Sequence, residues 1–135
     1  MIKTVCYLSD SVEHNTMDEL KTLYEKAKEN NRANNITGVL IYKDRNFLQV
    51  LEGEEHHVDQ TFKRIEKDKR HKNIFEIINS EIEERIFEDY NFGFTIVNNS
   101  EELKNLYQYL DWLKEADSSH VNKVVKMVEN FVSSK

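Results

Sequence analysis

The 135-residue sequence has no proline, only three glycines and a single cysteine, Cys6. One cysteine cannot form an internal disulfide, and an unpaired thiol is typical of the reducing cytoplasm. No apolar run approaches the roughly 20 residues of a membrane span. The first apolar stretch also runs directly into polar Ser9 and Asp10, unlike a signal peptide. We therefore expect a soluble, cytoplasmic protein that does not insert into a membrane.

Net positive charge is also lacking, because the formal charge is −6 and acidic side chains are spread along most of the chain. A nucleic-acid-binding domain usually presents a basic face, so we expect no nucleic-acid partner. The basic residues cluster only between positions 63 and 72. Positive charges at a helix C-terminus are stabilised by the helix dipole, so a solvated helix end is the default explanation. The alternative is a phosphate site, with Arg64, Arg70 and His71 as candidates.

Motifs for common cofactors and nucleophiles are missing as well. The glycines at positions 38, 53 and 93 form neither a Rossmann turn nor a Walker loop, and no G-x-S-x-G or thiol–histidine pattern occurs. His56 and His57 are adjacent, so they do not share a helix face, and no cysteine or third histidine is spaced to help. We expect no bound metal and no dinucleotide held by a Rossmann turn.

The hydrophobic patterns that are present suit one compact domain, to which the length and the 39% apolar content also point. Strands are predicted at 2–8, 36–43, 47–52, 74–82 and 92–97. One helix is predicted from about 17 to 30 and a second after Gly53. The polar turn Asp44–Asn46 makes the second and third strands an antiparallel hairpin. The order βαββαββ predicts an α+β, ferredoxin-like sheet with two helices on one face.

Two further helical stripes follow the last predicted strand. Apolar residues recur at helical spacing from Leu103 to Leu113 and from Val121 to Phe131. Amphipathic helices must bury such stripes, and either the open face of the sheet or a partner subunit would serve. We divide the chain into a domain at 1–98 and a helical extension at 99–135, and we expect a homo-oligomer formed through the extension.

Gln49 is the residue that local pattern alone singles out. Strand alternation places it on the same sheet face as Phe47 and Leu51. An unpaired amide among such neighbours would cost roughly 1–3 kcal/mol. A hydrogen bond within the protein is one explanation, and contact with the polar edge of a ligand is the other. Because an amide both donates and accepts, rotating or tautomerising it would change its contacts.

Tyr7 and Asn31 are further candidates with ordinary alternatives. Tyr7 ends the first predicted strand, where most tyrosines pack with the hydroxyl at the surface, although a phenol can give an electron and a proton to an excited acceptor. Asn31 belongs to an asparagine-rich run between the first helix and the hairpin. Asparagine is common at helix ends because it tolerates left-handed backbone. The Asn31 amide would nevertheless be well placed to meet a ligand beside the helix.

Several ordered motifs, correctly separated from Tyr7, resemble the BLUF family, whose members sense blue light using FAD. The resemblance covers about Ile2 to Val97. It rests on the stretches Asn34–Tyr42, which follows Asn31 closely, Phe47–Gly53, Asp68–His71, and Arg85–Phe87 followed by Gly93–Phe94.

The resemblance implies a ferredoxin-like fold with the flavin ring held between the two helices. By position, it implies that Tyr7 is the electron and proton donor, that Gln49 is the amide whose hydrogen bonds rearrange, and that Asn31 anchors the ring. The positions that match flavin-contacting or supporting residues are Arg64, Asp68, Arg70 and His71. FAD is the implied cofactor, with FMN and riboflavin as alternatives, because no motif for the adenosine end is recognisable.

Two departures from the family pattern concern the output. Tyr90 stands where many members carry a tryptophan, and Phe92 where many carry a methionine, so we assign both to the signal relay. The resemblance implies a photoreceptor and not an enzyme, which signals to an unknown protein partner through the apolar tail helices. The alternatives are a small acylphosphatase-type hydrolase and a ferredoxin-like binding module without photochemistry.

Overall fold

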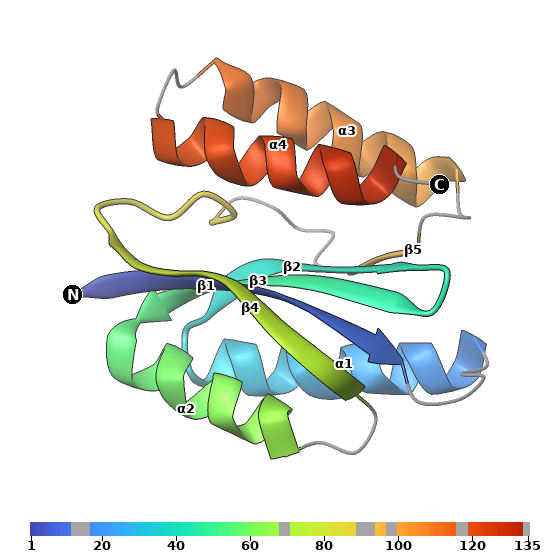
Figure 1. Cartoon of the computed structure of the whole chain (residues 1–135), viewed down its shortest axis with the longest axis horizontal. Helices are drawn as coiled ribbons and strands as arrows, with labels where there is room; N and C mark the ends of the chain where they lie inside the picture. The colour runs from blue at the N-terminus through green and yellow to red at the C-terminus, as the bar shows by residue number, and fades with distance from the viewer. Residues whose placement is uncertain (12–16, 68–70, 89–93, 97–99, 116–118, 134–135) are drawn as a thin grey trace.

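The structure, a computed structural model, describes residues 1–11, 17–67, 71–88, 94–96, 100–115 and 119–133. Its elements follow the predicted order: β1 (Ile2–Ser11), α1 (Met17–Ala33), β2 (Thr37–Lys43), β3 (Asn46–Glu54), α2 (Glu55–Lys67), β4 (His71–Ile82), β5 (Phe94–Ile96), α3 (Ser100–Lys114) and α4 (Ser119–Ser133). They stack in three layers, with α1 and α2 on one face of the sheet and α3 and α4 on the other (Figure 1).

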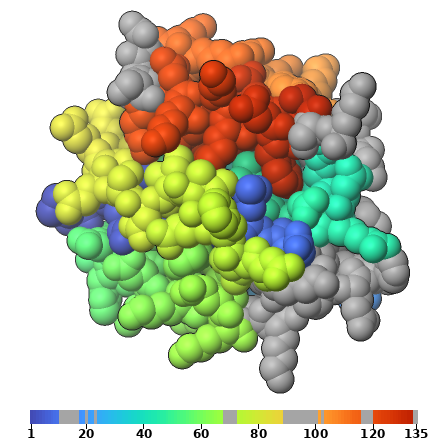
Figure 2. All heavy atoms as spheres, in the orientation of Figure 1, coloured from blue at the N-terminus to red at the C-terminus, as the bar shows by residue number. Residues whose placement is uncertain are grey.

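The sheet has the strand order β4-β1-β3-β2-β5. The first four strands pair antiparallel, and β5 runs parallel to β2 at the edge. This arrangement, with α1 and α2 together on one face, confirms the predicted ferredoxin-like fold. At the other edge, β4 pairs with β1 on one side only, and it lies between α4 and α2 on the face shown in Figure 2.

The asparagine-rich run ends α1 three residues beyond the predicted boundary. Asn35 has a left-handed backbone, with φ of 53°, and the Ile36 N–H donates to the Asn31 carbonyl at 2.7 Å. The Asn35 N–H donates to the Arg32 carbonyl at 3.3 Å. These are the two hydrogen bonds of a Schellman motif, which satisfies carbonyls left free at a helix end. The ordinary explanation therefore holds for Asn35, and it leaves the side chain of Asn31 free for another role.

The hairpin turn between β2 and β3 is shorter than predicted. Lys43 pairs with Asn46, so only Asp44 and Arg45 form the loop. Both have positive φ, 47° and 68°, as a two-residue type I′ turn requires. The tight turn fixes the register that brings Leu40 opposite Gln49.

Alternation along β3 divides the core into two sides. Leu51 packs with Val58 and Phe62 of α2, on the face that α1 and α2 cover. Leu48 and Val50 face the opposite way and pack with apolar residues of α3 and α4. The β3 strand is thus buried on both faces.

The two apolar stripes of the tail are buried against the sheet within the same chain. The buried stripe residues, each at most 6% exposed, are Leu106, Leu110, Leu113, Val124, Val125, Val128 and Val132. The open face of the sheet, one of the two predicted locations, is therefore where these stripes pack. In the part of the chain that the structure describes, no helix is long and apolar enough to cross a membrane.

Candidate functional site

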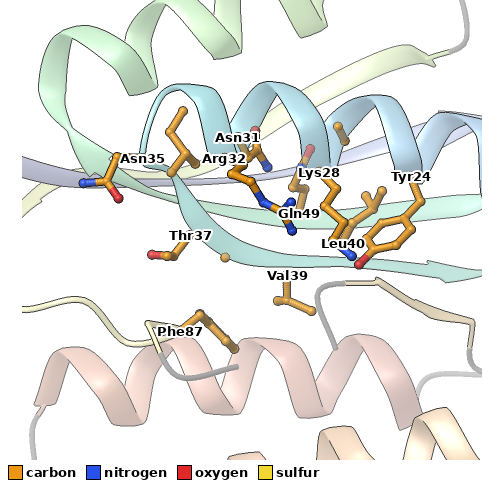
Figure 3. A pocket seen from close by; sticks show the side chains of 13 residues that line it. Tyr24, Lys28, Asn31, Arg32, Asn35, Thr37, Val39, Leu40, Gln49 and Phe87 are labelled. Atoms are coloured by element: carbon orange, nitrogen blue, oxygen red, sulfur yellow. The ribbon is translucent and has the colours of Figure 1, made fainter. Parts of the chain in front are cut away.

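A cavity of about 340 Å³ lies between α1 and the start of β2 (Figure 3). Its volume falls within the roughly 300–1,000 Å³ of typical small-molecule sites. The residues that line it are Tyr24, Ala27, Lys28, Asn31, Arg32, Asn35, Ile36, Thr37, Gly38, Val39, Leu40, Gln49 and Phe87. Two of the three principal candidates, Asn31 and Gln49, thus share one cavity.

Tyr7 joins this site through Gln49. The two residues are register partners on β1 and β3, and the Tyr7 hydroxyl donates a hydrogen bond to Gln49 Oε1. Tyr7 is fully buried, and its ring packs against Phe62 with the centroids 5.5 Å apart. Packing and the hydrogen bond together hold the phenol beside the amide.

The other end of the Gln49 amide lies at the cavity. The side chain is only 6% exposed, and in the described part of the chain no residue accepts a hydrogen bond from Nε2. An amide nitrogen that meets no protein acceptor needs water or a ligand group as its partner. The protein-internal explanation holds for the oxygen end of the amide. The ligand explanation stays a prediction for the nitrogen end, since Gln49 lines the cavity.

α1 contributes polar and charged groups to the same cavity. Lys28, Asn31 and Arg32 lie three and four residues apart and therefore share a helix face. Figure 3 shows them projecting from α1 toward β2. Among the described residues, the Asn31 amide has no hydrogen-bond partner, which leaves it available to a ligand. Lys28 and Arg32 were not among the predicted site residues, because charges on one helix face are usually solvated.

The predicted basic cluster is only partly described. Arg64 does not line the cavity; its guanidinium donates to Asn30 Oδ1 and so joins α2 to α1 next to Asn31. His71 begins β4, but its side chain is outside the described residues. The remaining predicted residues that lie outside the described part are Asp68 and Arg70 of the cluster and Tyr90 and Phe92 of the relay.

Glu52 is a buried group that the sequence analysis did not single out. It is fully buried on the α3–α4 side of β3 and accepts hydrogen bonds from the backbone N–H groups of Ile86 and Phe87, at 2.6 and 2.7 Å. The Thr37 hydroxyl donates to it at 3.2 Å. Burial raises the pKa of Glu52 above its usual value, and these hydrogen bonds and the nearby Arg85 offset only part of that rise. A charged residue in the same alternation as Leu48 and Val50 was the signal that could have drawn attention to it.

The residues of the cavity fit a flavin. Leu40 and Ile36 supply apolar surface for a planar ring, and the amides of Asn31 and Gln49 supply hydrogen bonds for its polar edge. Lys28 and Arg32 add the positive charge that a phosphate-bearing flavin would need. The unpartnered Gln49 Nε2 is the observation that carries this fit, since a flavin carbonyl would satisfy it.

Comparisons with known proteins identify the family of the chain. The sequence matches the model of the BLUF family, described as sensors of blue-light using FAD, over residues 2–93. It is 32% identical over 84 residues to photoactivated adenylate cyclase subunit alpha of Euglena gracilis. That match covers 62% of this chain and 8% of the relative. It is 30% identical over 78 residues to the blue light- and temperature-regulated antirepressor BluF of Escherichia coli strain K12, covering 58% of this chain and 19% of the relative.

Among solved structures, the dark state of BlrB, a BLUF protein, superposes with a TM-score of 0.70 at 25% identity, over 99% of this chain and 97% of that one. The chain thus spans a small fraction of the two sequence relatives but nearly all of this structural neighbour. Neither the hydrolase nor the light-insensitive binding module gains support from these relatives. The chain belongs to the BLUF family, the blue-light sensors that use FAD as their chromophore.

Proposed function

We propose that Tyr7 and Gln49 register the absorption of blue light by a flavin held in the cavity between α1 and β2. The observation that carries the proposal is the buried Tyr7–Gln49 hydrogen bond, together with the Gln49 amide nitrogen that lines the cavity without a partner in the described chain. When bound, the flavin supplies light absorption and an excited state that takes up and returns an electron and a proton.

Tyr7 is the donor in this scheme. Its phenol is fully buried and its proton already points at Gln49 Oε1, so the amide lies on the path that the proton would take. Electron and proton both return to Tyr7, and no net oxidation results. Burial excludes water, which would otherwise offer the phenol proton competing acceptors.

Gln49 is the residue whose hydrogen bonds stay changed after the electron and the proton have returned to Tyr7. A phenol hydroxyl can donate or accept, so the amide can rotate or tautomerise without losing its hydrogen bond to Tyr7. The change alters which amide group meets the cavity. A bound flavin would report a stronger hydrogen bond from this amide as a small, reversible red shift in absorption.

Asn31 anchors the flavin ring in this proposal, and Lys28 and Arg32 serve its phosphate groups. The amide of Asn31 is on the cavity wall and has no partner in the described part of the chain. FAD is the chromophore of the family. Arg64 supports the site from α2 through Asn30, and we retain Asp68, Arg70 and His71 as supporting residues by their place in the sequence motif.

The signal passes to a separate protein or domain. The relatives named above are a photoactivated cyclase and a light-regulated antirepressor, and in both the match covers less than a fifth of the protein. We propose that the present chain is likewise sensory and not itself catalytic. Because the inner stripes of α3 and α4 are buried, partner or self-association contacts use their outer faces, where Trp112 is 53% exposed. The single thiol of Cys6, buried and unoxidised, supports a cytoplasmic location.

Two pairs of variants test the mechanism. Tyr7→Phe keeps the ring that packs on Phe62 and removes the hydroxyl, so it should bind flavin and lose the red shift on illumination. Tyr42→Phe, a half-buried tyrosine that packs on Phe47, is the matched control and should keep the shift.

Gln49→Ala should likewise lose the normal response, whereas Gln108→Ala on the exposed side of α3 should not. A full, normal red shift in flavin-loaded Tyr7→Phe would show that the proposed donor is wrong.

A further inference from the structure

Glu52 binds a neighbouring segment to the strand that carries Gln49. The two residues lie three positions apart on β3, on opposite faces. Both carboxylate oxygens of Glu52 accept backbone hydrogen bonds, from Ile86 at 2.6 Å and from Phe87 at 2.7 Å. A buried N–H group that lost such an acceptor would be left without a partner, which costs about 1–3 kcal/mol. Residues 86 and 87 are therefore bound to β3 through this one side chain.

The segment at 86–87 in turn contacts both the cavity and α3. Phe87 forms part of the cavity wall, across β2 from the α1 side chains (Figure 3). Its ring stacks on the ring of Tyr109 in α3, with centroids 5.7 Å apart and an interplanar angle of 24°. The Tyr109 hydroxyl donates to the Ile86 carbonyl at 2.6 Å. A continuous series of contacts thus leads from β3 to α3.

Burial makes this connection stiff. Glu52 is fully buried, so water cannot replace its N–H partners if the strand and the segment separate. A buried carboxyl group in this position must keep its hydrogen bonds, and a shift of β3 must carry residues 86 and 87 with it. Close packing transmits such a shift because the stacked rings of Phe87 and Tyr109 cannot absorb it.

A second cavity, of about 470 Å³, lies on the other side of the same segment. Its lining includes Arg85, Ile86 and Glu88 of this segment together with Trp112 of α3 and His120 of α4. Any displacement of residues 86 and 87 therefore changes the surface beside Trp112.

We propose that Glu52 is a positioning residue that couples the Gln49 rearrangement to α3 through Ile86, Phe87 and Tyr109. The inference rests on the proposed function, because it assigns the route by which that light response leaves the site. The residues named in it do not include Tyr90 or Phe92 of the predicted relay.

Trp112 offers a direct readout. It is the only tryptophan of the chain, it lies in α3, and its ring is 5.3 Å from that of Tyr109. In the flavin-loaded full chain, the absorption spectrum reports the Gln49 event and tryptophan fluorescence reports α3. Glu52→Gln should keep the red shift and lose most of the light-induced change in Trp112 fluorescence. Glu54→Gln, which removes the same charge from the exposed end of β3, should keep both.

A second variant covers the case in which Glu52→Gln does not fold. Tyr109→Phe keeps the stacked ring and removes only the hydrogen bond to Ile86, so it should weaken the Trp112 response without changing the red shift. Tyr107→Phe on the same helix is its control. In the dark, the Ile86 and Phe87 amides of Glu52→Gln should also exchange hydrogen about tenfold faster, because glutamine offers these two N–H groups only one acceptor oxygen.

The outcomes separate the two proposals. A wild-type protein without a red shift would overturn the proposed function and this inference with it. An intact red shift combined with a wild-type Trp112 response in Glu52→Gln, or in Tyr109→Phe where the first variant does not fold, would overturn this inference alone.

Discussion

Replacing Gly38 by alanine should displace β2 from β3 at the position of the cavity. Gly38 has φ of +152°, in a region that residues with a side chain rarely adopt. A Cβ atom added there would lie 1.8 Å from the carbonyl oxygen of Val50 and 2.8 Å from its carbonyl carbon. Both are backbone atoms of β3, so no side-chain rotation can relieve the contact.

The magnitude follows from two costs. Backbone held in a sparsely populated region costs about 1–3 kcal/mol, and forcing extra volume into a packed site costs about another 1–3 kcal/mol. Together they predict a loss of about 2–6 kcal/mol from the free energy of unfolding, out of a typical total of about 5–15 kcal/mol. Because Val50 follows Gln49 directly, the shift should also weaken flavin binding.

Urea unfolding followed by circular dichroism measures the effect, at a fixed flavin concentration because ligand binding stabilises the folded state. Gly53→Ala on β3 is the matched control. Its added Cβ would lie 3.3 Å from the nearest atom, the Asn35 carbonyl oxygen, and its φ is not in the left-handed region. The control should change the free energy of unfolding by about 1 kcal/mol or less. Equal losses in the two variants would refute the close contact at Gly38.

Two further predictions concern Cys6 and the charged cavity wall. The Cys6 side chain is 1% exposed, and its burial raises the pKa of the thiol to about 12. Alkylation at pH 8 should therefore require denaturation, and rapid labelling of the folded protein would contradict this. Because the pKa of the folded state lies above the usual 9.0, the stability that the thiol contributes is present below pH 9 and is lost as the pH rises toward 12. Comparing the alkaline unfolding of the wild type with that of Cys6→Ala measures this loss. Lys28→Ala and Arg32→Ala should each weaken the binding of FMN and FAD about two- to five-fold but leave the binding of riboflavin, which has no phosphate, unchanged. The control Lys26→Ala, on the exposed surface of α1, should leave the binding of all three flavins unchanged. If titrations show equal weakening for all three flavins, these cations do not contact a phosphate.

Periodicity was sufficient to predict the fold, because each strand and helix has a clear apolar pattern. The end of α1 was missed by three residues, since a Schellman motif depends on backbone hydrogen bonds that no apolar pattern reveals. The sequence left two possible surfaces for the packing of α3 and α4, the open face of the sheet and a partner subunit, for a different reason. An amphipathic stripe must be buried, but its pattern does not say against what.

Some residues of the site could be predicted from local sequence, whereas others depend on contacts between distant parts of the chain. Gln49 could be identified from strand alternation, because its neighbours are apolar on the same face. Glu52 could not be interpreted from sequence, since its main partners are backbone amides 34 and 35 residues away. Phe87 likewise reaches the cavity only through the folded chain. Lys28 and Arg32 look like any solvated helix face until β2 is placed opposite them.

A light-minus-dark absorption spectrum of the flavin-loaded protein tests the central claim most directly. A Tyr7–Gln49 pair that faces the flavin should produce a small red shift that appears under blue light and reverses fully in the dark. A flavin-loaded, folded protein whose spectrum does not change on illumination would contradict the account.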